Sequence, residues 1–142
     1  MTVRVSRTFE FPVPAERVWE FIADPAKRAD AISVVDEFSV GEDGTATWHV
    51  RLPIPIIDST VTVETRDVTR DPPRHVEFTG RSRVMWVSGE HTVEPTESGC
   101  RLHNEFVVEG RLPGVERFFE RHLDDELDNL EAALRRDLGL AA

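Results

Sequence analysis

The sequence predicts an α+β domain in which an antiparallel sheet of about seven strands packs against one long C-terminal helix. Between residues 33 and 110, apolar and polar residues alternate with a period of two, and short segments rich in Gly, Pro and Asp interrupt them. This pattern is typical of consecutive antiparallel strands. From residue 115 to 138, apolar residues recur every three or four positions, as on one face of a helix. A sheet and a helix bury such faces against each other, and 142 residues fit a single domain, residues 1–142.

The first 31 residues predict a strand followed by two short helices. The strand ends at Pro12, because proline lacks the N–H that a ladder needs, and Pro14 suits the first turn of a helix. Asp24 and Pro25 stop this helix, since the residue before proline avoids the α region. Residues 26–31 predict a second short helical turn. The apolar face of the first helix consists of Ala15, Val18, Trp19 and Ile22.

Six more strands and the long helix complete the predicted elements. The strands are expected at 34–40, 46–52, 57–68, 76–80, 84–94 and 100–108. The apolar face of the helix is expected to carry Val115, Phe118, Phe119, His122, Leu123, Leu127, Leu130, Leu134 and Leu138.

The charge of the chain disfavours polyanionic partners. Its formal net charge is −10, so nucleic acids and anionic membranes are repelled. Sixteen of the 17 basic residues are Arg, and Lys27 is the one Lys. An acidic, lysine-poor surface fits a halophilic, high-salt cytoplasm, where salt screens self-repulsion. A GC-rich genome that favours Arg codons explains the same bias, and both explanations stay open.

The chain is expected to be cytoplasmic. No apolar run approaches the ~20 residues of a membrane helix, and the N-terminus lacks the apolar core of a signal peptide. A single cysteine, Cys100, excludes an intrachain disulfide. Its place in an alternating strand favours a small core residue over a nucleophile.

Three segments resemble a known superfamily. The stretch from Phe11 to Pro25, Phe-Pro-Val-Pro-Ala-Glu-Arg-Val-Trp-Glu-Phe-Ile-Ala-Asp-Pro, resembles the opening signature of the START-like, or SRPBCC, superfamily of lipid-transfer domains, polyketide cyclases and aromatases. Residues 65–74 resemble its mid-sheet turn, and residues 108–114 are similar to its carbon monoxide dehydrogenase branch. The resemblance implies a helix-grip fold, in which the curved sheet wraps around the long helix and leaves a cavity. It implies no shared catalytic motif, so the fold alone does not decide the function.

Motifs of common catalytic and binding sites are absent from the sequence. The histidines, at 49, 75, 91, 103 and 122, have no metal-ligand spacing. No G-x-S-x-G, P-loop or G-x-G-x-x-G occurs. We therefore expect no metal and no cofactor.

His91 and Asn104 form the strongest polar candidate. If the strands around residues 95–99 pair so that Leu102 faces Val93, Asn104 falls opposite His91 on the apolar face. Such a pair has either a structural role, bonded to each other or to water, or a functional one, in which it binds a ligand carbonyl or moves a proton. A register slip by one residue instead places Trp86 and Glu90 inside.

Two further positions are ambiguous. Val63 and Val68 have opposite parity, so a bulge is expected between them, and it would turn Glu64 or Arg66 inward or leave both exposed. A buried Arg could anchor a ligand carboxylate. His122, on the apolar helix face near Phe119, is a third candidate lining group.

These observations predict a protein that binds a small hydrophobic or amphipathic ligand, lipid- or polyketide-like, in an internal cavity. One alternative is an enzyme with cyclase or dehydratase chemistry, for which the candidate catalytic residues are His91, Asn104 and His122. Another, implied by the resemblance to the carbon monoxide dehydrogenase branch, is an accessory protein of an oxidoreductase or membrane complex, and a homodimer is also compatible. The expected ligand-binding residues are Phe9, Phe11, Trp48, Val61, Val63, Phe78, Val87, His91, Asn104, Phe106, Phe119, His122 and Leu123.

Overall fold

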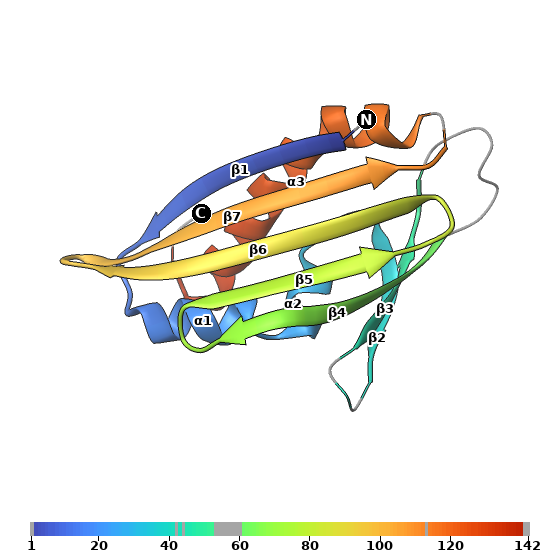
Figure 1. Cartoon of the computed structure of the whole chain (residues 1–142). Helices are drawn as coiled ribbons and strands as arrows, with labels where there is room; N and C mark the ends of the chain where they lie inside the picture. Colours follow the sequence, from blue (N-terminus) through green and yellow to red (C-terminus); the bar gives the residue numbers. More distant parts are fainter. Residues whose placement is uncertain (1, 42, 44, 53–60, 113, 141–142) are drawn as a thin grey trace.

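The computed structural model describes residues 2–41, 43, 45–52, 61–112 and 114–140. Their elements, in chain order (Figure 1), are β1 (Thr2–Phe11), α1 (Ala15–Ile22), α2 (Pro25–Asp30), β2 (Val35–Val40), β3 (Ala46–Val50), β4 (Val61–Asp71), β5 (His75–Arg81), β6 (Met85–Thr96), β7 (Gly99–Gly110) and α3 (Val115–Asp137). The strands form one antiparallel sheet in the order β1-β7-β6-β5-β4-β3-β2. The predicted helix-grip α+β fold is therefore confirmed. The first four residues of the predicted strand 57–68 lie outside the described residues.

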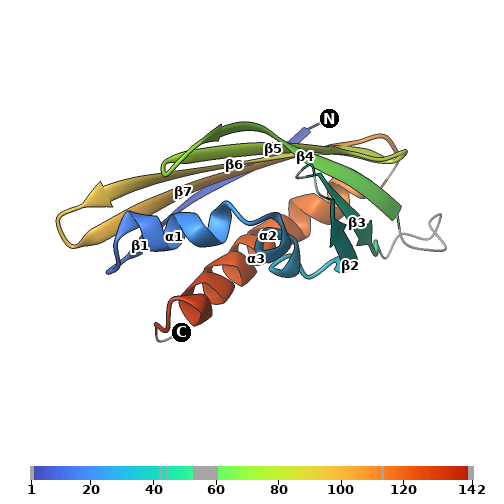
Figure 2. The ribbon, with the colours of Figure 1, turned by 90° about the horizontal axis from the view of Figure 1, so that it is seen from below.

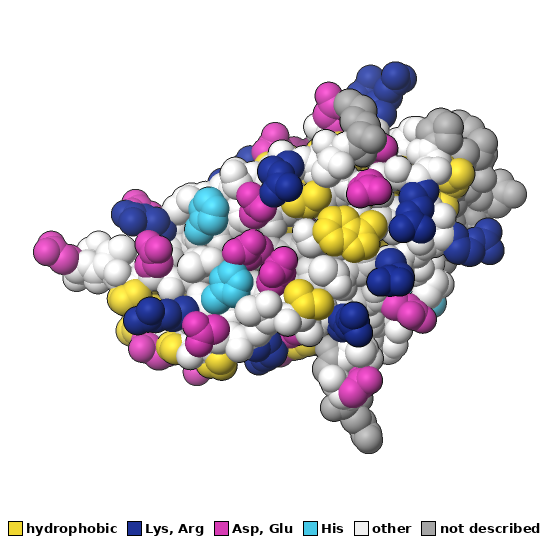
Figure 3. Space-filling view, viewed as in Figure 1, with side chains coloured by type: hydrophobic (Ala, Val, Ile, Leu, Met, Phe, Trp, Pro, Cys, Tyr) yellow, Lys and Arg dark blue, Asp and Glu magenta, His cyan; other side chains and the backbone are white. Residues whose placement is uncertain are grey.

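The three helices lie on the same side of a strongly curved sheet. Figure 2 shows the sheet arched over α1, α2 and α3, with β2 and β3 bending down at one end. The opposite face of the sheet is covered by no helix among the described residues and carries charged side chains of both signs (Figure 3). This division follows from the period-two pattern, which sends apolar side chains to one face and polar ones to the other. Within the same described ranges, no helix has the length and apolar content needed to cross a membrane.

The start of the chain folds as its prolines suggest. Pro14 directly precedes α1, and Pro25 occupies the first turn of α2. Asp24 caps α2, because its Oδ1 accepts a hydrogen bond of 2.9 Å from the backbone N–H of Ala26. The short α2 thereby turns Arg28 and Ala29 toward the sheet, where both are buried.

The core has two parts, one at each end of α3. The first lies between the sheet and the N-terminal half of α3, and it includes Trp48, Val63, Phe78 and Phe119. The second is made by α1, the C-terminal half of α3 and the facing ends of β1, β6 and β7, and its members include Phe9, Phe11, Val18, Ile22, Cys100 and Leu134. Cys100 is 1% exposed, and burial raises its thiol pKa, which agrees with the core assignment.

The bulge expected between Val63 and Val68 is present. The register of β4 against β5 shifts between Asp67 and Thr69, so Val68 is left out of the pairing and is 47% exposed. Glu64 and Arg66 are both exposed. The side chain that turns toward the helices is that of Asp67, whose carboxylate is 11% exposed.

Candidate functional site

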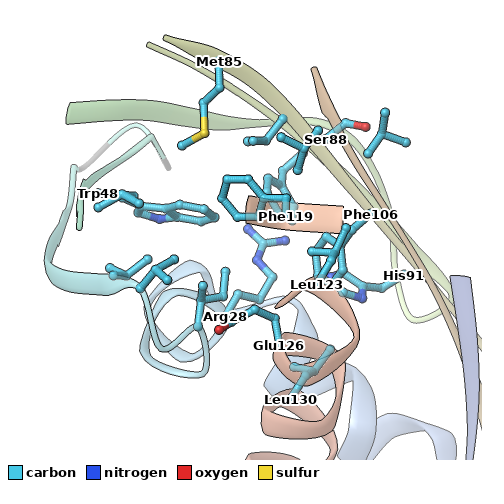
Figure 4. A pocket seen from close by; sticks show the side chains of 18 residues that line it. Arg28, Trp48, Met85, Ser88, His91, Phe106, Phe119, Leu123, Glu126 and Leu130 are labelled. Atoms are coloured by element: carbon cyan, nitrogen blue, oxygen red, sulfur yellow. The ribbon is translucent and has the colours of Figure 1, made fainter. Parts of the chain in front are cut away.

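A cavity of about 60 Å³ lies in the first part of the core, between the sheet and the N-terminal half of α3. Residues of α2, β2 and β3 close one side of it, and apolar side chains make up most of the wall. Figure 4 shows its lining residues. The cavity brings together seven of the residues that the sequence predicted: Trp48, Phe78, Val87, His91, Phe106, Phe119 and Leu123.

Five other predicted residues are buried or partly buried outside the cavity wall. Phe9 and Phe11 do not line it, because they pair with Leu102 and Cys100 at the end of the sheet that α1 fills. Val61 and Val63 pack in the first core cluster behind the wall. Asn104 is fully buried behind His91.

His122 is not a cavity residue, and its predicted place on the inner face of α3 is wrong. Its side chain is 49% exposed, and it lies 3.8 Å from the Asp125 carboxylate and against the ring of Phe118. At about 100° per residue, His122 stands roughly 60° from Phe119, on the side away from Leu123. That rotation is enough to bring the imidazole to the solvent edge of the buried face.

His91 and Asn104 pair as the favoured register predicted. His91 faces Asn104 across β6 and β7, and Val93 faces Leu102. Asn104 donates from Nδ2 to the backbone oxygen of Arg7 at 3.1 Å, so its Oδ1 is the acceptor for His91 Nδ1–H at 2.7 Å. This network assigns the Nδ1–H tautomer and leaves Nε2 as a free acceptor.

His91 is neutral at physiological pH. Burial lowers its pKa to about 4, and the charge of Arg28 acts in the same direction, whereas the hydrogen bond to Asn104 acts against them. A neutral imidazole with a free Nε2 can accept a hydrogen bond or a proton from a molecule in the cavity.

Phe78 is the centre of the site. Its ring packs on Trp48, His91 and Phe106 at centroid distances of 5.8, 6.3 and 6.4 Å. The space for this ring exists because residue 89, on the neighbouring strand, is glycine: a Cβ there would overlap Phe78 and lie 2.8 Å from Phe106.

A buried ion cluster, which the sequence did not predict, joins the cavity from α2. Arg28 is 5% exposed and lies over Phe78, with Cζ 5.0 Å from the ring centroid. Its Nη2 donates to Asp67 Oδ1 at 2.6 Å, and Arg70 Nη1 donates to Asp67 Oδ2 at 2.9 Å. Burial lowers the pKa of Arg28 from its ordinary value, and Asp67 opposes that change. The bulge at Val68 is the sequence signal that could have indicated Asp67.

Glu126 is the second lining residue that the sequence missed. It is 6% exposed on α3, and its two carboxylate oxygens accept hydrogen bonds from the backbone N–H and the hydroxyl of Ser33. This contact ties α3 to the segment between α2 and β2. Helical spacing places Glu126 within about 20° of Phe119 on the buried face, but a carboxylate is not expected inside without a partner.

Two buried donors at the cavity have no acceptor among the described residues. They are Arg28 Nη1 and Trp48 Nε1, and both side chains line the cavity. In the same part of the chain, no three His, Cys, Asp or Glu side chains are grouped to hold a metal ion.

A larger hollow of about 520 Å³ lies over β3, β4 and β5, away from this chemistry. Its lining is polar and includes Glu64, Arg66 and Arg81, all of them exposed. Because it gathers no buried functional group, we assign the candidate site to the smaller cavity.

A curved antiparallel sheet that holds a long helix, with a mostly apolar cavity between them, defines the START-like class. The family model described as polyketide cyclase / dehydrase and lipid transport matches residues 2–135, so the chain belongs to this family. No curated protein sequence matches the chain significantly.

Solved structures share the fold at low identity. A conserved protein from Geobacillus kaustophilus has a TM-score of 0.77 and 12% identity, with 96% of this chain and 95% of that chain covered. The Zhui aromatase/cyclase from Streptomyces sp. R1128 has a TM-score of 0.69 and 21% identity, with 96% of both chains covered. A START superfamily protein from Mycobacterium smegmatis has a TM-score of 0.67 and 16% identity, with 92% and 93% covered.

Proposed function

We propose that this protein binds a small hydrophobic or amphipathic molecule in the cavity between the sheet and α3. The observation that carries the proposal is the arrangement of three polar groups, from Arg28, Trp48 and His91, around Phe78 in an otherwise apolar wall. Apolar cavities with a few oriented polar groups are typical ligand sites. Membership of the family supports a ligand-binding or cyclase role in general.

The cavity volume limits the size of the ligand. About 60 Å³ holds a few water molecules or a small organic group, whereas pockets for drug-sized ligands measure roughly 300–1,000 Å³. A lipid- or polyketide-like ligand therefore requires the wall to move. Met85 lines the cavity, and its unbranched thioether adapts its shape more readily than the surrounding rings.

Native mass spectrometry and solvent extraction of the purified protein test the proposal. We expect a bound apolar compound that Val87→Phe excludes, because Val87 lines the cavity and a larger side chain fills it. Val68→Phe is the matched control, since Val68 is exposed on the bulge of β4. Absence of any extractable compound, or equal loading of Val87→Phe and wild type, would contradict ligand binding in this cavity.

A second candidate is a polyketide cyclase or dehydratase that uses the same cavity. It is favoured by the neutral His91, whose free Nε2 could accept a proton from a bound substrate while Asn104 holds the ring. The aromatase/cyclase among the structural neighbours has the same fold. His91→Ala is expected to abolish turnover of a polyketide-like substrate while the fold is kept. Unchanged turnover in that variant would refute this role.

The accessory role implied by the resemblance to the carbon monoxide dehydrogenase branch, a homodimer and a cytoplasmic location stay predictions. The accessory role predicts that an oxidoreductase or membrane complex is purified together with the tagged protein.

A further inference from the structure

We infer that the ligand is an apolar carboxylate whose oxygens are bound by Arg28 Nη1 and Trp48 Nε1 inside the cavity. This inference rests on the proposed ligand-binding function and names the chemistry of its ligand. It assigns a binding role to Arg28, which lies on α2, far in sequence from His91 and Asn104.

Two buried donors at the cavity call for an oxygen acceptor. Arg28 is 5% and Trp48 is 7% exposed, yet neither Arg28 Nη1 nor Trp48 Nε1 has an acceptor among the described residues. A buried N–H without an acceptor is costly, so native proteins rarely contain one without a reason. An oxygen atom of a ligand in the cavity would remove this cost for both donors.

The charge of the cluster at α2 favours an anionic ligand. One carboxylate, that of Asp67, is shared between Arg28 and Arg70, so these three groups carry one positive charge in excess. Glu126 also lines the cavity, but Ser33 donates to both of its oxygens, and within the described ranges Glu126 forms no ion pair with Arg28. A buried cluster with an uncompensated positive charge favours an anion over a neutral ligand.

Arg28 and Trp48 face the same space. Both contact the ring of Phe78, at 5.0 and 5.8 Å from its centroid. Figure 4 shows the Arg28 side chain directed into the cavity from α2 and the Trp48 ring directed into it from β3. The two donors therefore approach one ligand group from two sides. A guanidinium group and a carboxylate form strong charge-assisted hydrogen bonds.

The apolar wall decides between kinds of anion. A phosphate brings up to two charges and several oxygens, for which the cavity offers too few donors, whereas a carboxylate brings one charge and two oxygens. The remaining wall is made by Val50, Met85, Phe119 and Leu123 among others, and these side chains can only pack on a hydrocarbon part of the ligand.

The test compares two carboxylates with neutral amides of nearly the same shape. The probes are benzoate with benzamide and, for a smaller volume, butanoate with butanamide. Binding is followed in ¹⁵N-labelled protein by NMR of the indole N–H groups, which report on Trp19, Trp48 and Trp86 separately. Trp48→Phe assigns the Trp48 signal.

We expect the carboxylate of at least one pair to bind at least tenfold more tightly than its amide. It should also shift the Trp48 indole signal downfield while those of Trp19 and Trp86 stay in place. Arg28→Met should remove the preference, and Trp48→Phe should weaken carboxylate binding severalfold. Arg51→Gln is the matched control, because Arg51 is exposed and pairs with Asp36 outside the cavity.

The possible results distinguish the carboxylate from ligand binding in general. Equal binding of amide and carboxylate, or a preference that persists in Arg28→Met, overturns the carboxylate while ligand binding stands. If no probe binds and extraction yields no compound, both are wrong. Should Arg28→Met fail to fold, Trp48→Phe decides, since unchanged carboxylate affinity there refutes the proposed contact.

Discussion

The burial of His91 predicts a specific loss of stability in mild acid. The pKa of this histidine is about 4 in the folded protein because the ring is buried, and it is about 6.5 in an unfolded chain. Between these values the unfolded chain binds a proton at His91 that the folded chain does not. The stability that depends on the neutral ring is therefore fully present above pH 6.5 and is lost as the pH falls toward 4.

The size of the effect follows from the two pKa values. Each unit of difference corresponds to about 1.4 kcal/mol, so His91 alone is expected to destabilise the fold by about 2 kcal/mol at pH 5 and about 3 kcal/mol at pH 4. For a domain of this size, a loss of about 2 kcal/mol is a large part of a total stability of roughly 5–15 kcal/mol.

Urea unfolding at pH 7.5, 6.0 and 5.0 measures this effect. Other groups also titrate in this range, so the quantity compared is the difference between wild type and His91→Gln, which keeps a donor for Asn104 but does not gain a proton. The wild type should lose about 2 kcal/mol more than this variant on going to pH 5. His103→Gln, which removes an exposed imidazole from β7, should follow the wild type. Parallel curves for wild type and His91→Gln would refute the reasoning.

Three further predictions concern packing, ion pairing and salt. Gly89→Ala should cost about 1–3 kcal/mol, because the new Cβ would overlap the Phe78 ring; chemical denaturation should show no comparable loss for Ser88→Ala on the other face of β6. Asp67→Asn should cost about 3 kcal/mol, because it leaves Arg28 buried with a charge and no carboxylate; a loss below about 1 kcal/mol would mean that water or another group reaches Arg28. If the acidic surface is a halophilic adaptation, thermal unfolding should give a much lower midpoint at low salt than at molar salt, and equal midpoints would exclude it.

The fold was predictable because its signals are local and repeated. The proline at position 14 and the cap at Asp24 act on their neighbours in sequence, and each strand shows its buried face by alternation over several residues. The pairing of His91 with Asn104 was predictable for the same reason, because the short turn between β6 and β7 fixes the register.

The polar part of the site was predictable only where it lies on a strand of clear parity. Arg28 is on a six-residue helix with no periodic signal, and its partner Asp67 is turned inward by the bulge at Val68. Glu126 looked like a surface carboxylate, since its partner Ser33 is 93 residues away in the chain. His122 was misplaced because one helical position at the edge of an apolar face separates burial from exposure.

The arrangement of the site favours binding over simple packing. A core that served only stability could replace Arg28 and Trp48 by apolar side chains of similar volume, which is often neutral or stabilising for buried ion pairs. Instead, donors from α2 and β3 meet beside a ring from β5, and the glycine on β6 makes room for that ring. Four separate elements thus maintain a cavity with two N–H groups that lack an acceptor among the described residues. This loss of stability has a physical explanation if a ligand with an oxygen acceptor occupies the space.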